Sequence, residues 1–341
     1  MAYTTINKPS DYFNTKLYTG TGSSNSVTGV GFQPDMTWFK HRNGTSEHNI
    51  YDAVRGATKR IIPNDNSAEG TQSNGLSAFG SDGFTVVDSN ATNLNNGTYA
   101  SWNWKANGAG SANTDGSINS TVSVNQTAGF SIVKWTGTQS LGTVGHGLNS
   151  VPKMIIIKNT SALENWIVYH NSLGNTKNLY LDATNTEHTR SDTFNNTSPT
   201  SSVFTVNTAT GVNKTGSTMI AYCFAEKTGY SRFSKYQGTS STDGAFIYTG
   251  FKPTFFMAKC IDNAESWYIF DNKREGYNVE NRDLYADNTG TEGSADWLDI
   301  LSNGIKFRYN SIGLNGSSNN YIFMAFGQSL VGSNNVPCTA R

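Results

Sequence analysis

The amino-acid sequence predicts an all-β protein made of three tandem repeats of a small antiparallel β-sandwich with jelly-roll-like connections. Short apolar and aromatic runs follow one another at intervals of roughly 8–12 residues, and turns rich in Gly and Asn separate them, as in sandwiches and jelly rolls. No window keeps apolar residues at i, i+3, i+4 and i+7 for three helical turns, so helices are expected to be scarce. The third observation is a motif that occurs three times along the chain.

Each copy of the motif begins with a proline and continues with an apolar run that ends in a lysine. The lysine stands six residues after the proline, and a tyrosine or phenylalanine stands eleven residues after the lysine. The second and third copies add a tryptophan in the second apolar run. The motif residues are Pro34, Lys40 and Tyr51 in the first copy, Pro152, Lys158, Trp166 and Tyr169 in the second, and Pro253, Lys259, Trp267 and Phe270 in the third.

Two further landmarks repeat with the same spacing as the prolines. One is a turn of the form aromatic-x-Gly-Thr, and the other is the end of an aromatic strand near the close of each unit. For all three landmarks the second copy lies 117 to 120 residues after the first, and the third lies 101 or 102 residues after the second. Chance does not produce such agreement, so the chain is triplicated. The turns begin at Tyr18, Trp135 and Tyr236, and the strands end at Trp104, Phe224 and Phe326.

Within each unit the residues predict strands in a fixed order. The first strand ends in the aromatic-x-Gly-Thr turn, and a second run leads up to the proline. The strand with the lysine comes next, followed by the strand that ends in Tyr or Phe. Another strand precedes the last, aromatic one, which follows an Asn/Gly/Ser turn. The second runs cover 27–32, 142–151 and 245–251; the later strands begin near 83, 203 and 304; the last strands cover 99–104, 219–224 and 321–326.

The apolar run after each proline indicates a central strand. Residues 154–157 and 255–258 are apolar without alternation, which predicts burial on both faces. The last strand of the first unit, 99–104, alternates instead, as a half-buried strand does. A proline at the first position of a strand removes no hydrogen bond that the strand interior needs. The lysine strand is therefore expected between two layers.

These patterns divide the chain into six segments. Residues 107–128 are mostly small and polar, and we expect them to be a flexible linker. Few residues join the second and third units, so these two are expected to lie closer together. The predicted segments are an N-terminal arm at 1–11, repeats at 12–106, 129–227 and 228–328, the Gly/Ser/Asn-rich linker at 107–128, and a C-terminal tail at 329–341.

Composition excludes several function classes. The net charge is zero and only 15% of residues are charged, so the chain lacks the basic surface of a nucleic-acid binder. It has no run of eighteen apolar residues and no signal peptide, so we expect no membrane insertion and synthesis in a cytoplasm without secretion. Three cysteines form no CxxC pair, and Cys223 and Cys260 lie in apolar runs, where we expect them to be buried.

No constellation in the sequence supports catalysis, a cofactor or a metal. The histidines lack ligand spacing, and neither a nucleophile elbow nor a phosphate-binding loop occurs. The residue after the motif's last aromatic is Asp52, His170 or Asp271, and exchange of Asp for His would abolish a calcium site in one copy. We therefore expect these three residues at exposed strand ends, with a polar or metal-binding role as the alternative. The chain is predicted not to be an enzyme.

The motif lysines are likewise expected to be solvated at strand ends. The tryptophans lie inside apolar runs and are predicted to be core residues, although those at loop edges could stack on a sugar. The tryptophans in question are Trp38, Trp102, Trp104, Trp166 and Trp267.

The three units, GFQPDMTWFK…IYDAVRG, VPKMIIIK…NWIVYH and KPTFFMAK…SWYIFDNKREG, resemble a recurrent module of tailed-phage virion proteins. The module is common in tail-fibre and structural proteins of phages that infect marine bacteria, and the resemblance covers residues 12 to 328. It implies a non-enzymatic virion component, tail-associated and oligomeric, with a trimer favoured by analogy. Its expected partners are other virion proteins and a glycan or protein of the host surface.

A second interpretation stays open. The sequence has no coiled-coil shaft, and only about eleven residues precede the first unit. A capsid decoration or tail-accessory protein with a purely architectural role is therefore the alternative.

Overall fold

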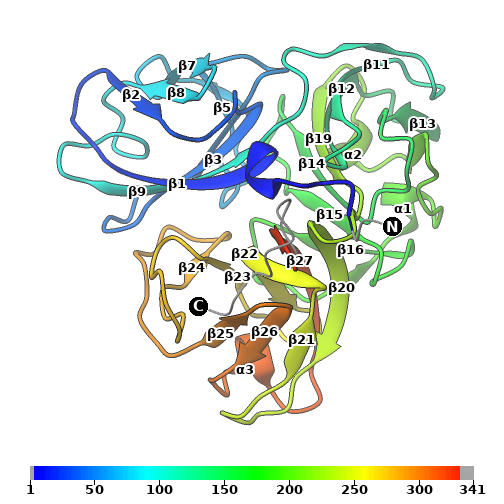
Figure 1. Ribbon diagram of the computed structural model, residues 1–341. Coiled ribbons are helices and arrows are strands. Elements are labelled where there is room, and N and C mark those ends of the chain that lie inside the picture. Colours follow the sequence, from blue (N-terminus) through cyan, green and yellow to red (C-terminus); the bar gives the residue numbers. More distant parts are fainter. Residues whose placement is uncertain (1–3, 331–341) are drawn as a thin grey trace.

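Three large antiparallel sheets carry the fold, and each contains one copy of the motif. The structure is a computed structural model that describes residues 4–330. Strands account for 42% of it and helices for 5%, which confirms the all-β fold class. Figure 1 shows the sheets as groups coloured blue to cyan, green, and yellow to red around a common centre. We call them the N-terminal, middle and C-terminal sheets.

The N-terminal sheet has the strand order β1-β9-β3-β4, and a smaller sheet of order β2-β8-β7 belongs to the same part of the chain. The short strands β5 and β6 pair with each other. A 3-10 helix, η1 (Pro9–Asp11), precedes the first strand. The strands are β1 Phe13–Thr19, β2 Asn25–Thr28, β3 Met36–His41, β4 Asn49–Asp52, β5 Lys59–Arg60, β6 Gly70–Thr71, β7 Leu76–Gly80, β8 Gly83–Val86 and β9 Thr98–Trp104.

The middle sheet has the order β10-β11-β12-β19-β14-β15-β16-β17, and β13 pairs with β18 in a smaller sheet. Two one-turn helices, α1 (Ser191–Phe194) and α2 (Thr210–Asn213), lie in its connections. The strands are β10 Ser111–Asn113, β11 Ser120–Asn125, β12 Phe130–Thr136, β13 Gly142–Gly145, β14 Met154–Asn159, β15 Ile167–His170, β16 Lys177–Tyr180, β17 His188–Thr189, β18 Val203–Val206 and β19 Thr218–Phe224.

The C-terminal sheet has the order β20-β27-β22-β23-β24, with a smaller sheet of order β21-β26-β25 and the helix α3 (Ile312–Asn315). Its strands are β20 Ser231–Gln237, β21 Phe246–Tyr248, β22 Phe251–Cys260, β23 Trp267–Asp271, β24 Leu284–Tyr285, β25 Leu298–Leu301, β26 Gly304–Phe307 and β27 Asn320–Ser329.

The lysine strand is central in every large sheet. It pairs on one side with the last strand of its part and on the other with the strand that ends in Asp or His. All residues of β3 and β14 are buried, as the unbroken apolar runs predict. The residues opposite each other are Met36 with Trp104 and Asp52, Met154 with Phe224 and His170, and Phe255 with Phe326 and Asp271.

Each large sheet has two buried faces. One face of all three contributes to a single central cluster, in which the ring of Phe326 lies within 6.3 Å of the rings of Phe13, Trp104, Phe224 and Phe255. The opposite face of each sheet packs in a separate local cluster with its own smaller sheet. The five expected core tryptophans all belong to the central cluster, so the sheets share one core.

Segment 107–128 differs from the expected flexible linker. It contains β10 and β11, and β11 pairs along its whole length with β12, which extends the middle sheet. The reason is the run STVSVN, whose β-branched residues favour a strand; Val122 and Ser123 are buried there. Likewise, Ile6 of the predicted polar arm is buried in the central cluster. Residues 1–3 of the arm, and residues 331–341 of the predicted tail with Cys338, lie outside the described residues.

Candidate functional site

The polar residues of the motif lie where neighbouring large sheets meet. We call these places the first seam (N-terminal and middle sheets), the second seam (middle and C-terminal sheets) and the third seam (C-terminal and N-terminal sheets). Each seam is crossed by hydrogen bonds from side chains whose partners are far away in the sequence. The seams therefore bring together residues that no local pattern connects.

The motif lysines are buried in the seams, so the expectation that they are solvated is wrong. Lys40, Lys158 and Lys259 are each 0% exposed. Each ammonium donates to one backbone carbonyl of a loop in a neighbouring part and to carbonyls of its own part, and together these supply the partners that a buried charge needs. The bonds across the seams are Lys158 Nζ to Asn66 O (2.8 Å), Lys259 Nζ to Thr184 O (3.1 Å) and Lys40 Nζ to Thr289 O (3.0 Å). Burial lowers the pKa of all three lysines to about 8.

Asp52, Asp271 and His170 are also buried, and the expectation of exposed strand ends is wrong for all three. Asp52 Oδ2 accepts a hydrogen bond from the Tyr222 hydroxyl across the first seam, at 2.7 Å. Asp271 Oδ2 accepts one from Trp102 Nε1 across the third seam, at 2.9 Å. A carboxylate can be buried at these places because a donor from the next sheet meets it.

The second seam explains why its copy has histidine instead. The residue of the C-terminal sheet that corresponds to Trp102 and Tyr222 is Met324, which lies two residues before the end-of-strand aromatic and has no O–H or N–H to donate. His170 Nε2 instead bonds to the carbonyl oxygen of Phe323, at 3.1 Å. Burial lowers the pKa of His170 to about 4, so its ring is neutral. In each seam the residue after the motif's last aromatic therefore fits its partner on the neighbouring sheet: aspartate meets a side-chain donor, and histidine meets a carbonyl oxygen.

Arginines complete the two acidic seams. Arg55 Nε lies 2.5 Å from Asp52 Oδ2, and Arg274 Nε lies 2.7 Å from Asp271 Oδ2. Burial alone would raise the pKa of Asp271, but Arg274 and the other donors hold it below its ordinary value. In the middle part the residue three after His170 is Leu173, which packs against the central cluster. The second seam therefore lacks both the arginine of the ion pair and the side-chain donor that the first and third seams have.

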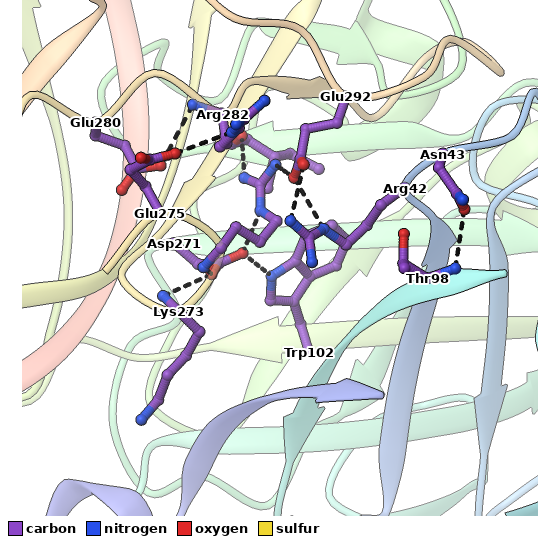
Figure 2. A network of polar contacts seen from close by, with 12 residues as sticks. Arg42, Asn43, Thr98, Trp102, Asp271, Lys273, Glu275, Glu280, Arg282 and Glu292 are labelled. Atoms are coloured by element: carbon purple, nitrogen blue, oxygen red, sulfur yellow. Dashed lines mark hydrogen bonds and ion pairs between the residues drawn. The ribbon is translucent and has the colours of Figure 1, made fainter. Parts of the chain in front are cut away.

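Figure 2 shows how the third seam is held. Arg42 of the N-terminal part donates two hydrogen bonds to Glu292, Nε to Oε1 at 3.0 Å and Nη2 to Oε2 at 2.8 Å. Glu292 Oε1 also accepts from Arg274 Nη1 at 3.1 Å. This carboxylate therefore bridges two arginines from different sheets. The N-terminal part is tied to the others, although the long segment before the middle sheet predicted a freer unit.

The remaining motif residues support the same seams. The Nε1 of Trp166 donates to the carbonyl of Ile62, and the Nε1 of Trp267 donates to that of Tyr180, each at 2.8 Å and each across a seam. The aromatics Tyr51, Tyr169 and Phe270 belong to the local clusters instead. Pro34, Pro152 and Pro253 are buried, and Pro253 lies inside β22 beside a bulge rather than at the strand's first position.

Two features of the described residues bear on metal and acid–base chemistry. Among residues 4–330 no group of three or more His, Cys, Asp or Glu side chains is placed to hold a metal ion. A cleft of about 360 Å³ beside η1 is lined by Lys8, Tyr230 and Lys273 among others, with no Asp or Glu in its lining. Cys223 and Cys260 are free and buried. None of the helices within residues 4–330 has the length or apolar character needed to cross a lipid bilayer.

The model of one protein family, described as a domain of unknown function (DUF7483), matches residues 8–329. The chain belongs to this family. The matched range spans all three large sheets and the segment 107–128, so the family is defined by the whole arrangement rather than by one sheet. No curated protein and no solved structure matches the chain.

Sequence reasoning missed the residues that meet the motif across the seams. Trp102 and Tyr222 were expected only as apolar residues, and Arg42, Arg55, Arg274 and Glu292 were not singled out. One signal was present: Asp-x-x-Arg occurs in the first and third copies, and His-x-x-Leu replaces it in the second. A joint exchange of an acid and a base three residues apart indicates that the two side chains act as a pair.

Proposed function

We propose that the chain is three repeats of one jelly-roll-like β-sandwich, arranged about a pseudo-threefold axis. The support is the common strand order of the large sheets, the common register around the lysine strand, and the cyclic order of the lysine contacts. Each repeat buries one face of its large sheet in the shared core. Repeats that cannot bury their apolar face alone are stabilised by their neighbours in this way. The repeat boundaries predicted from the sequence remain part of this proposal.

The function that this arrangement supports best is that of a non-enzymatic structural protein of a phage virion. We favour a tail fibre or appendage component that contributes to recognition of the host surface. The observation that carries the proposal is the use of the motif's charged residues: Lys40, Asp52, Lys158, Lys259 and Asp271 are all 0% exposed and bound within the seams. They hold a scaffold together and are not presented to a substrate.

The resemblance of the three units to a tailed-phage virion module supports the proposed location on the virion. The alternative is a capsid decoration or tail-accessory subunit that contacts virion proteins alone. The chain would associate with other virion proteins in either case, and homotrimers are favoured by analogy with phage appendages.

Location on the particle tests the proposal. An antibody against the purified protein should label the tails of intact virions, and a reconstruction of the particle should place the chain there. Labelling on the capsid faces would favour the decoration protein, and absence from purified virions would overturn both. Release of reducing ends from host envelope material would contradict the non-enzymatic assignment.

A further inference from the structure

The smaller sheet of the C-terminal part carries an exposed pair of aromatic side chains. Phe246 and Tyr248 of β21 are 47% and 49% exposed, whereas Ile247 between them is buried in the local core. Residues i and i+2 of a strand point to the same face. The two rings therefore lie side by side on the outer surface of this sheet, away from the core.

The corresponding sheets of the other parts have no such pair. In β2 the exposed positions are Ser26 and Thr28, and β13 consists of small residues and one valine. In the three parts this strand pairs with β8, β18 and β26, the strands that begin at Gly83, Val203 and Gly304, so the positions can be compared directly. A requirement of the fold would recur in each part. The aromatic pair does not, which points to a role outside the scaffold.

The neighbouring strand shapes the surface beside the rings. Phe246 stands opposite Lys306, and Tyr248 stands opposite Gly304. A Cβ atom at Gly304 would lie 2.8 Å from the ring of Phe246, so the glycine leaves room for that ring to lie across the sheet. The result is an apolar shelf bordered by a cation. We define the outer shelf as Arg232, Phe246, Tyr248, Gly304 and Lys306.

The outer shelf and its border carry an excess of positive charge. Lys306 is paired with Asp243 at 2.8 Å, and Arg308 is paired with Asp299 at 2.5 Å. Arg232 lies 5.8 Å from the centre of the Tyr248 ring, and within the described residues it has no ion pair with a carboxylate. Its Nε is buried without a hydrogen-bond partner among residues 4–330. A ligand from solvent does not reach this buried atom, but an anionic ligand on the shelf would balance the charge of the guanidinium.

We propose that the outer shelf binds an acidic polysaccharide. The C–H face of a sugar ring would pack on Phe246 and Tyr248, and the carboxylate of a uronic acid would meet Arg232. Two adjacent half-exposed rings suit two successive sugars of a chain, and the unpaired guanidinium selects an acidic polymer over a neutral one. The inference rests on the proposed role in host-surface recognition and identifies the chemical class that is recognised.

The test measures binding of the purified full-length protein to alginate, polygalacturonate and hyaluronate, with dextran as the neutral polymer. We expect binding to at least one acidic polymer, weakened by added salt, and none to dextran. The double substitution Phe246→Ala and Tyr248→Ala should weaken binding by on the order of tenfold or more. Arg232→Gln should weaken it and reduce its dependence on salt.

Two controls keep the test specific. Tyr277→Ala removes a 62% exposed aromatic elsewhere and should leave binding unchanged. Unchanged melting temperatures of the variants would show that they are folded, because these are surface substitutions.

Binding to none of the acidic polymers, or equal binding by the double variant, would overturn the inference. A protein located on tails that binds no polymer would refute the outer shelf alone. A protein that binds through the shelf but is absent from virions would refute the proposed location alone.

Discussion

At the scale of single residues, the seams are held by hydrogen bonds to buried charges. Asp52 accepts a hydrogen bond from the hydroxyl of Tyr222, which belongs to the middle sheet. Tyr222→Phe should therefore lower the free energy of unfolding by about 1.5–3 kcal/mol, the usual contribution of a hydrogen bond to a charged group. Chemical denaturation measures this change in the free energy of unfolding. Tyr230→Phe is the matched control, because that hydroxyl is buried without a partner among residues 4–330, and it should change stability far less.

The exchange of aspartate for histidine in the second seam predicts a rescue. His170→Asp would place a carboxylate beside Met324 and the Phe323 carbonyl with the backbone N–H of Ser172 but no side-chain donor, which should destabilise the protein by about 3–5 kcal/mol. Adding Leu173→Arg and Met324→Tyr supplies the two partners that Asp52 has in the first seam. We expect the triple variant to recover much of the lost stability in thermal unfolding. A triple variant no more stable than His170→Asp would contradict the matching of partners across the seams.

The histidine also makes the second seam sensitive to acid. Burial lowers the pKa of His170 from 6.5 to about 4 in the folded protein, so the unfolded chain binds more protons between these values. Stability is complete above pH 6.5 and falls as the pH drops toward 4, by about 3 kcal/mol from this residue. Denaturation at several pH values should show this slope. It should be reduced in His170→Gln, whereas an unchanged slope would assign the effect to other buried histidines.

At the scale of elements, each motif lysine anchors a loop of a neighbouring part as well as a carbonyl of its own part. Lys158 on β14 holds the carbonyl of Asn66 in the loop between β5 and β6. Lys158→Met keeps the aliphatic stem but removes the ammonium, so that the Asn66 carbonyl keeps the backbone N–H of Glu164 as a donor and loses the lysine. We expect faster hydrogen exchange in residues 62–69, while the exchange of β14 changes little.

Two other lysines, Lys259 and Lys153, provide internal controls for the substitution of Lys158. Lys259→Met should loosen the loop around Thr184, with no effect on residues 62–69. Lys153→Met, which alters a lysine outside the three motif positions, should affect neither loop. Equal loosening of both loops by either motif substitution would indicate a general loss of stability instead of a local anchor.

At the scale of the whole molecule, the shared core should make the protein unfold as one unit. Phe13, Trp104, Phe224, Phe255 and Phe326 come from all three sheets and pack together. Scanning calorimetry should therefore show a single transition, with equal calorimetric and van't Hoff enthalpies. Phe326→Ala should lower the melting temperature through a loss of about 3–5 kcal/mol and still leave one transition. Three resolved transitions would show that the parts fold independently.

Much of the fold was predictable from the sequence because it depends on local patterns. The unbroken apolar runs placed β14 and β22 between two layers, and the Gly/Asn turns marked the strand ends. Segment 107–128 was misjudged because small polar residues outweigh its short β-branched run, although that run pairs with β12. The structure of this segment depends on pairing with the edge of β12, and the composition of the segment carries no information on that edge.

The candidate site was predictable only in part. Sequence alone determined that the lysine, the final aromatic and the following Asp or His form one repeated motif, since their spacing is identical in each copy. It could not determine that Lys40, Asp52 and His170 are buried, because a charged residue can be buried only where a partner meets it. The partners across the seams lie 153 to 249 residues away, from Phe323 for His170 to Thr289 for Lys40. The tertiary structure decided this by bringing three sheets around one core.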